Sequence, residues 1–227
     1  MVALGFFVTG TDTGVGKTLA ACALLHAFAV RGLRVVGMKP VAAGREDGRY
    51  TDVDALRDAS NVRADLQRVN PYAFEPPIAP HIAAEMSGLS IDIDHLVRAH
   101  RALALSADVV IVEGAGGFMI PLNHRETSAD LAQQLGLPVL LVVGMRLGCL
   151  NHALLTRRAI QAQGLACAGW ICNVIDPQML CFDENRDSLI DRLDAPLIGT
   201  FPHTVNPVLT DYASYLNLDV LQGARRE

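Results

Sequence analysis

Aromatic residues are scarce in this chain of 227 residues, since they make up 5% of it and include a single Trp. Basic residues are also in the minority, because 19 Lys and Arg stand against 24 Asp and Glu, which gives a formal net charge of −5. A nucleic-acid groove needs a basic stripe on one face, and no such stripe is visible in the sequence. We therefore expect no nucleic-acid partner.

Cysteine pairs and long apolar runs are missing as well. The five cysteines, Cys22, Cys149, Cys167, Cys172 and Cys181, are odd in number, and no two have the Cys-x-x-Cys spacing of a zinc or redox motif. This pattern favours a reduced, cytoplasmic protein with buried thiols. No apolar run approaches the roughly 20 residues that span a bilayer, and the N-terminus lacks the basic segment of a signal peptide. We expect no membrane association.

Hydrophobic residues are plentiful, at 51%, which excludes disorder over most of the chain. Apolar, strand-like runs alternate with stretches of helical period, and three of these stretches are followed by a glycine suited to a left-handed stop, namely Gly32, Gly136 and Gly164. The alternation predicts an α/β fold with a parallel sheet of about seven strands, flanked by helices on both faces, as one domain over residues 1–227. The strand-like runs are Val2–Val8, Arg34–Met38, Val109–Val112, Val139–Val143, Ala166–Cys172 and Leu197–Thr200. The helical stretches are Lys17–Val30, Val53–Ala59, Ile91–Leu105, Ser128–Leu135, Asn151–Gln163 and Gln178–Arg192.

A glycine-rich segment joins the first strand-like run to the first helical stretch. It reads Gly10-Thr11-Asp12-Thr13-Gly14-Val15-Gly16-Lys17-Thr18, and a Gly-Lys-Thr ending that opens a helix is the core of a P-loop. Backbone N–H groups of such a loop surround phosphates, its lysine neutralises the β- and γ-phosphates, and its threonine hydroxyl binds Mg²⁺. The spacing is a variant, because Thr11 stands where the standard pattern has Gly. The residues expected to bind a nucleotide here are Thr13, Gly14, Val15, Gly16, Lys17 and Thr18.

Glu113 ends an apolar run that starts at Asp108, which is the form of a Walker B carboxylate. Beside a P-loop, such a carboxylate reaches the Mg²⁺ ion directly or through water. Small residues follow it and let the backbone approach phosphates or substrate closely. The residues of this segment that we expect to line the nucleotide site are Glu113, Gly114, Ala115 and Gly116.

Lys39 follows the second strand-like run and is fixed in place by Pro40. Two interpretations are open: Lys39 faces the γ-phosphate and neutralises charge that develops during transfer, or it is an ordinary surface lysine. Asp52 and Asp54 both lie where a later helix begins. Each could serve as an N-terminal helix charge, and the sequence does not choose either as a metal ligand.

These motifs, taken with others along the chain, resemble the dethiobiotin synthetase family. The most specific are the Gly-Thr-Asp-Thr opening of the P-loop, the Lys-Pro pair after the second run and a Leu-Gly-x-x-Asn-His segment. The resemblance runs from about residue 6 to residue 218. The segments that carry it are Phe7–Thr13 with Lys17-Thr18, Lys39–Ala42 with Gly44, Val69–Tyr72, Pro80-His81, Val112–Gly117, Leu147–His152 and Ala168–Trp170 with Asn173.

The resemblance implies an ATP- and Mg²⁺-dependent ligase of biotin biosynthesis that acts on 7,8-diaminopelargonic acid and CO₂. One amine becomes a carbamate, ATP phosphorylates the carbamate, and the second amine closes the ureido ring to give dethiobiotin, ADP and phosphate. The resemblance also implies a homodimer whose interface lies near the substrate site. By position it assigns catalysis to Thr13, Lys17 and Lys39, magnesium ligation to Thr18, Asp54 and Glu113, base contacts to Asn173, Pro202, His203 and Thr204, and substrate contacts to Ala43, Gly148, Cys149, Leu150 and Asn151.

Ala43 departs from the family pattern, because members usually carry Ser or Thr at this position. The missing hydroxyl would bond the substrate or its carbamate, and losing one hydrogen bond to a charged group is worth roughly 1.5–3 kcal/mol. A backbone N–H or a water molecule could replace that bond. We expect the departure to affect activity by degree and not in kind.

A second class of function is a P-loop switch ATPase of the partition or site-placement type, which acts through a protein partner. Such proteins usually carry a second lysine inside the P-loop, and neither Thr11 nor Asp12 supplies it. A GTPase is a third class, but Asn173-Val174-Ile175-Asp176 lacks the lysine of the guanine-reading Asn-Lys-x-Asp motif. Motifs spread from Gly10 to Pro202 are expected to converge on one site, which favours a single domain.

Overall fold

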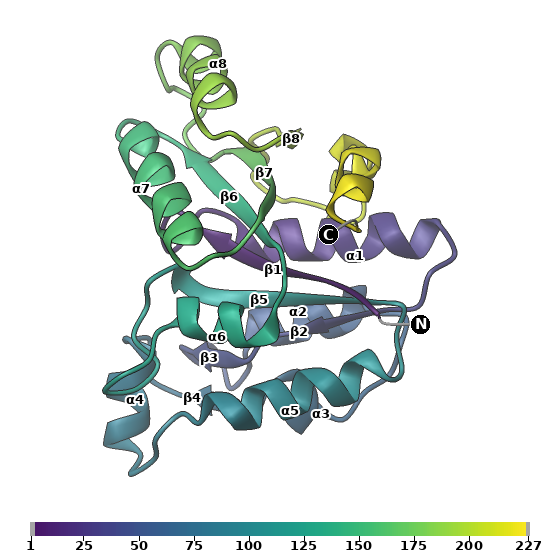
Figure 1. The fold of residues 1–227 in the computed structure, drawn as a ribbon, viewed down its shortest axis with the longest axis vertical. Helices are drawn as coiled ribbons and strands as arrows, with labels where there is room; N and C mark the ends of the chain where they lie inside the picture. The colour runs from purple at the N-terminus through teal and green to yellow at the C-terminus, as the bar shows by residue number, and fades with distance from the viewer. Residues whose placement is uncertain (1–2, 226–227) are drawn as a thin grey trace.

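A six-stranded parallel sheet forms the centre of the computed structural model, which describes residues 3–225 (Figure 1). Its strands follow the order β2-β5-β1-β6-β7-β8, so the strand that precedes the glycine-rich loop lies inside the sheet. All six predicted runs are strands, although Val2, the predicted first residue, lies outside the described residues. The strands are β1 (Leu4–Gly10), β2 (Val35–Met38), β5 (Val109–Gly117), β6 (Val139–Met145), β7 (Cys167–Val174) and β8 (Leu197–Phe201).

The α/β class is confirmed, whereas the expected number of about seven strands is slightly different. Within residues 3–225 the remaining strands form a separate parallel pair, β3 (Val41–Ala43) and β4 (Tyr72–Phe74). Both are three residues long, because each follows a proline, which cannot donate a ladder hydrogen bond, and β3 is followed by Gly44 with a φ of 98°. These strands lie in segments 40–52 and 70–81, whose Gly and Pro content is typical of loops.

The six predicted helical stretches are helices, with ends that shift by up to four residues. They are α1 (Lys17–Val30), α2 (Thr51–Ala59), α5 (Ile93–Ala104), α6 (Ser128–Leu135), α7 (Cys149–Ala162) and α8 (Phe182–Arg192). Gly32, Gly136 and Gly164 have φ values of 80°, 65° and 74°, which confirms the left-handed stops. The helical segments that the sequence did not predict are short: α3 (Leu66–Val69), α4 (Pro80–Met86), η1 (Asp211–Tyr215) and η2 (Leu218–Arg225).

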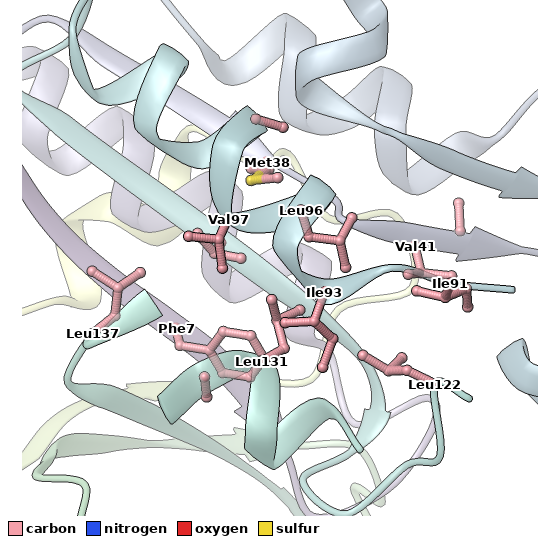
Figure 2. Close-up of a cluster of buried hydrophobic side chains, with 14 of the residues drawn as sticks. Phe7, Met38, Val41, Ile91, Ile93, Leu96, Val97, Leu122, Leu131 and Leu137 are labelled. Atoms are coloured by element: carbon pink, nitrogen blue, oxygen red, sulfur yellow. The ribbon is translucent and has the colours of Figure 1, made fainter. Parts of the chain in front are cut away.

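Both faces of the sheet are covered, because successive side chains of a strand point to opposite sides. In β1, Phe6 packs in the cluster that contains α1 and the C-terminal 3-10 segments, while Phe7 packs in the cluster that contains α5 and α6. Figure 2 shows Phe7 among Ile93, Leu131 and their neighbours. Truncating a fully buried Phe to Ala costs about 3–5 kcal/mol, so Phe6 and Phe7 each fix a helical layer to the strand that leads into the loop.

The structure bears on two features of the sequence, the unpaired cysteines and the lack of long apolar runs. All five cysteines are free. Burial is expected from the sequence for Cys149, Cys167 and Cys172, which lie in or beside apolar runs; Cys149 and Cys172 are buried, whereas Cys167 is only half-buried. Cys22 is buried as well. Burial raises the pKa of Cys22 and of Cys172 to about 12, so these thiols stay protonated and pack as small hydrophobic groups. Among residues 3–225, the helices are all too short or too polar to cross a membrane.

Candidate active site

The glycine-rich loop lies at the edge of the sheet where the parallel strands end, which is where α/β proteins bind ligands. Lys17 starts α1, and the N-cap residue Gly16 offers no side-chain hydrogen bond to the first turn. Gly14 and Gly16 have φ values of 74° and 93°, a left-handed region that an L side chain rarely adopts. In the part of the chain that the structure describes, the N–H groups of Lys17, Thr18 and Leu19 therefore have no hydrogen-bond partner. N–H groups of this kind can bind an anion, which is the role predicted for them in a P-loop.

Lys17 folds back onto its own loop, where its ammonium donates to the backbone oxygen of Asp12 at 2.9 Å. Its side chain is 7% exposed. Burial and, after it, the positive charge of Lys39 lower the pKa of Lys17 from 10.5 to about 8. Glu113, Asp12 and Asp52 oppose this shift, but none of them forms an ion pair with Lys17 among the described residues, so a phosphate in the loop would give Lys17 a direct counter-charge.

Glu113 is a buried carboxylate of β5 that contacts side chains from two other parts of the fold. It is 1% exposed, and its Oε1 accepts hydrogen bonds from the Thr18 hydroxyl at 2.9 Å and from the Lys39 ammonium at 2.6 Å. Its Oε2 is buried and has no hydrogen-bond partner among the described residues. Thr18 comes from α1, Lys39 follows β2 and Glu113 lies in β5, so the strand order itself brings these side chains together.

Lys39 lies inside the protein, not on its surface, and is 5% exposed. Besides Glu113, its ammonium contacts Asp52 Oδ2 at 2.8 Å. Burial opposes the charge, but the two carboxylates outweigh it and raise the pKa of Lys39 above its ordinary value. Its backbone is also held, because the buried amide of Asn70 donates to Lys39 O at 2.7 Å and to Tyr72 O at 2.9 Å. The site therefore contains a charged lysine in a fixed position, and Asn70 is a supporting residue to which sequence reasoning assigned no role.

Asp52 and Asp54 separate in the structure. Both lie in the first turn of α2, but only Asp52 contacts Lys39. Asp54 contacts Arg49 Nε at 2.8 Å and lines a cavity of about 490 Å³ beside α2. No hydrogen bond or ion pair of the described residues joins Asp54 to Glu113, so its expected ligand role stays a prediction.

A smaller cavity of about 170 Å³ brings together the four residues expected beside a base. Asn173, Pro202, His203 and Thr204 all line it, although they come from β7 and from the segment after β8. Tyr212, from η1, also lines it and was missed by sequence reasoning. Tyr212 packs edge-on against Phe201, and its hydroxyl donates to Pro202 O at 3.2 Å. The only sequence signal for Tyr212 was that it is an aromatic residue that follows the last predicted strand.

The small residues after Glu113 continue β5 toward the loop. A Cβ on Gly114 would meet the Phe7 ring at 3.1 Å, and a Cβ on Gly116 would lie 3.6 Å from the Thr13 hydroxyl. Gly117 pairs with Gly10 in the sheet register. Small residues in Gly114–Gly117, Ala115 included, therefore allow β5 to approach the loop closely. Their expected approach to phosphates or substrate stays a prediction.

The residues expected to contact a substrate lie at two other strand ends. Ala43 is half-buried at the end of β3. Gly148 caps α7 with a φ of 94°, Cys149 is buried, Leu150 is half-buried, and Asn151 is exposed in the first helical turn. The same segment reaches the loop through Arg146, whose guanidinium contacts Asp12 Oδ2 at 2.6 Å. No hydrogen bond or ion pair within residues 3–225 joins Ala43 or Gly148–Asn151 to Glu113 and Lys39.

Known proteins of similar sequence cover nearly the whole chain. A family model described as an AAA domain matches residues 5–210. A protein of Nitrosospira multiformis named ATP-dependent dethiobiotin synthetase BioD is 57% identical over 214 residues, which are 94% of this chain and 95% of the relative. A protein of the same name from Aromatoleum aromaticum is 54% identical, over 94% of this chain and 96% of the relative.

Solved structures with the same fold are more distant in sequence. The MinD cell division protein of Aquifex aeolicus is 19% identical with a TM-score of 0.58, over 99% of this chain and 98% of that one. The cell division protein FtsY of Thermotoga maritima is 18% identical with a TM-score of 0.52, over 96% of this chain and 68% of that one. At these identities the likeness shows the fold alone.

Proposed function

The chain belongs to the ATP-dependent dethiobiotin synthetase family, and on this premise we propose that it closes the ureido ring of dethiobiotin from 7,8-diaminopelargonic acid, CO₂ and ATP. The observation that carries the proposal is the buried cluster of Lys39, Glu113 and Thr18 beside the P-loop. A lysine fixed after β2 is an addition to the ordinary P-loop residues, and it suits a reaction in which anions accumulate next to the γ-phosphate.

The reaction that we propose has three balanced steps. One amine of the diamine attacks CO₂ and loses a proton, which gives a carbamate. A carbamate oxygen then attacks the γ-phosphorus of ATP, so that a carbamic–phosphoric anhydride forms and ADP leaves. The second amine attacks the carbamate carbon and loses a proton, the C–O bond to phosphate breaks, and ring closure releases inorganic phosphate.

Charge and position are the contributions that we assign to the side chains. Lys17 and Lys39 bring two positive charges to a site that collects the ATP phosphates and the carbamate, while Thr13 lies where the loop approaches Gly116. Preorganised charges of this kind need no reorganisation during the reaction, which is why they lower its barrier. No step of this scheme requires a protein nucleophile.

The residues present fit Mg²⁺, which prefers hard oxygen ligands. The Thr18 hydroxyl and the Glu113 carboxylate lie together, and Glu113 Oε2 is buried with no partner among the described residues. We propose that these two groups hold the ion with Asp54, which would first have to leave Arg49. Bound there, the ion would neutralise charge on the β- and γ-phosphates.

We further propose that the protein is a homodimer in which Gly148–Asn151 receive the carboxylate of the substrate bound mainly by the partner subunit. The support is local: Gly148 caps α7, a fourteen-residue helix, without a side-chain hydrogen bond. The Cys149 N–H donates to Arg146 O at 3.0 Å, whereas the N–H groups of Leu150 and Asn151 have no partner among the described residues and can bind an anion. An equal mixture of Lys39→Ala and Asn151→Ala chains, allowed to exchange subunits, would then contain one intact site in each mixed dimer. About a quarter of wild-type activity should return on mixing two nearly inactive proteins, and a mixture as inactive as its parts would argue for sites built within one subunit.

The decisive test of the reaction is ADP release by the purified protein with ATP, Mg²⁺ and bicarbonate, measured with and without the diamine. We expect release that depends on the diamine and a product with the mass of dethiobiotin. Hydrolysis that is indifferent to the diamine would favour the switch ATPase. That alternative shares only the fold with this chain, since the MinD structures are under 25% identical.

A further inference from the structure

Asn173 touches two parts of the candidate site that sequence reasoning treated separately. It lies near the end of β7, is 5% exposed and lines the cavity expected to hold the base. Its amide nitrogen also donates to the backbone oxygen of Val15 at 2.8 Å, across a separation of 158 residues. One side chain therefore contacts both the base cavity and the phosphate loop.

Close packing shows that this contact is built into the loop. A Cβ placed on Gly16 would overlap the Asn173 amide, so glycine at position 16 is required by the approach of Asn173 as well as by its φ of 93°. Val15 is 1% exposed, and a Cβ on Gly10 or on Gly144 would overlap its side chain. The Val15–Gly16 turn is thus held between the ends of β1, β6 and β7.

The hydrogen bond has a directional consequence for the loop. A peptide unit is planar and trans, so the carbonyl of Val15 and the N–H of Gly16 point in opposite directions. Because Asn173 binds the carbonyl from the side of β7, the Gly16 N–H is turned away from β7. In a P-loop that N–H belongs to the set that surrounds the phosphates.

We propose that Asn173 is a positioning residue for phosphate binding, which aims the Gly16 N–H and so links the base cavity to the phosphate loop. This inference rests on the proposed function, since it assumes that a nucleotide occupies both places. It differs from the role expected for Asn173 from the sequence, which was contact with the base alone. A residue that only contacts the base affects ligands that have a base, whereas a residue that aims the loop also affects a bare phosphate chain.

The test compares ATP with inorganic tripolyphosphate, each with Mg²⁺, by calorimetry on the full chain. The Asn173→Ala variant removes the donor, and the Asn173→Asp variant keeps the volume but presents an acceptor to the Val15 carbonyl. The control is Thr204→Val, a substitution of similar shape in the same cavity, at a residue with no hydrogen bond to the loop among those of the described chain. We expect both Asn173 variants to raise the dissociation constant of tripolyphosphate about tenfold, and Thr204→Val to leave it unchanged.

Hydrogen exchange provides a second measurement that does not depend on affinity. With tripolyphosphate and Mg²⁺ at saturating concentration, the loop amides of Asn173→Ala, Gly16 included, should exchange faster than those of wild type, while amides in β5 stay protected in both. The inference is overturned if ATP binding weakens while tripolyphosphate binding does not, or if Thr204→Val weakens tripolyphosphate equally. A wild-type protein that binds neither ligand would refute the proposed function, and this inference with it.

Discussion

Replacing Lys39 by Met should destabilise the protein strongly, because it leaves Glu113 buried without its counter-charge. Glu113 is 1% exposed, and Lys39 Nζ lies 2.6 Å from its Oε1. Removing one partner of a buried pair costs about 3–5 kcal/mol. For a chain of this length each kcal/mol lowers the melting temperature by about 2–4 °C, so we expect a fall of about 6–20 °C.

The matched control is Arg45→Met, which breaks an ion pair of the same length on the surface. Arg45 and Glu75 are also 2.6 Å apart, but their side chains are 43% and 72% exposed. Such pairs contribute about 0–1 kcal/mol, so the control should melt close to wild type. If Lys39→Met melted as close to wild type as Arg45→Met, the reasoning from burial would be refuted.

A double-mutant cycle with Lys39→Met and Glu113→Gln separates the pair from other effects of each substitution. The double variant removes both buried charges, so its loss of unfolding free energy in urea should be smaller than the sum of the single losses by about 0.5–3 kcal/mol. Strict additivity would contradict a coupled pair.

The Lys39→Met variant should also keep its affinity for ATP and lose turnover, and parallel loss of both would make Lys39 merely structural.

Four further outcomes are expected. Glu113→Gln should raise the Mg²⁺ concentration needed for half-maximal turnover, and an unchanged requirement would exclude Glu113 as a ligand. Ala43→Ser should lower the KM for the diamine, whereas no change would mean that the site already compensates for the absent hydroxyl. Thr127→Ala should cost about 1 kcal/mol in urea unfolding, because it breaks the capping box of α6. Burial alone would raise the pKa of Asp130, but hydrogen bonds from Thr127 and Gln163 outweigh it and lower that pKa. The stability that Asp130 contributes is therefore present above about pH 4 and lost as the pH falls through its lower folded value, so the gap between wild type and Asp130→Asn should close in acid and stay open at pH 7.

The sheet and its main helices could be predicted because their signals are local. Phe6 and Phe7 sit in an apolar run between a chain terminus and a glycine-rich turn, and six such runs alternate with helical stretches. Lys17 and Thr18 were identifiable because a P-loop needs them at fixed spacing at the start of a helix. That residues 1–227 form one domain stays a prediction.

Contacts between distant segments could not be predicted in the same way. Asp52 and Asp54 lie in one helical turn, but Asp52 contacts Lys39 and Asp54 contacts Arg49, a choice that depends on the packing of α2 in the folded protein. The bond from Asn173 to Val15 spans most of the chain, and no spacing rule marks it. The short strands β3 and β4 are stabilised by pairing with each other. This pairing joins distant segments, so it leaves no pattern among residues that are neighbours in the sequence.

The inner position of β1 has a consequence for synthesis on the ribosome. Its two neighbours in the sheet are β5 and β6. The register partner of Leu4 is Val109, which is synthesised about a hundred residues later. At about 5–20 residues per second, that delay is about 5–20 s. During this time an apolar strand with two open edges is exposed on the nascent chain, although it will become one of the most enclosed segments of the protein. A chain stalled before residue 109 should therefore bind a holdase chaperone through Leu4–Gly10, and one stalled after β6 has left the exit tunnel should release it.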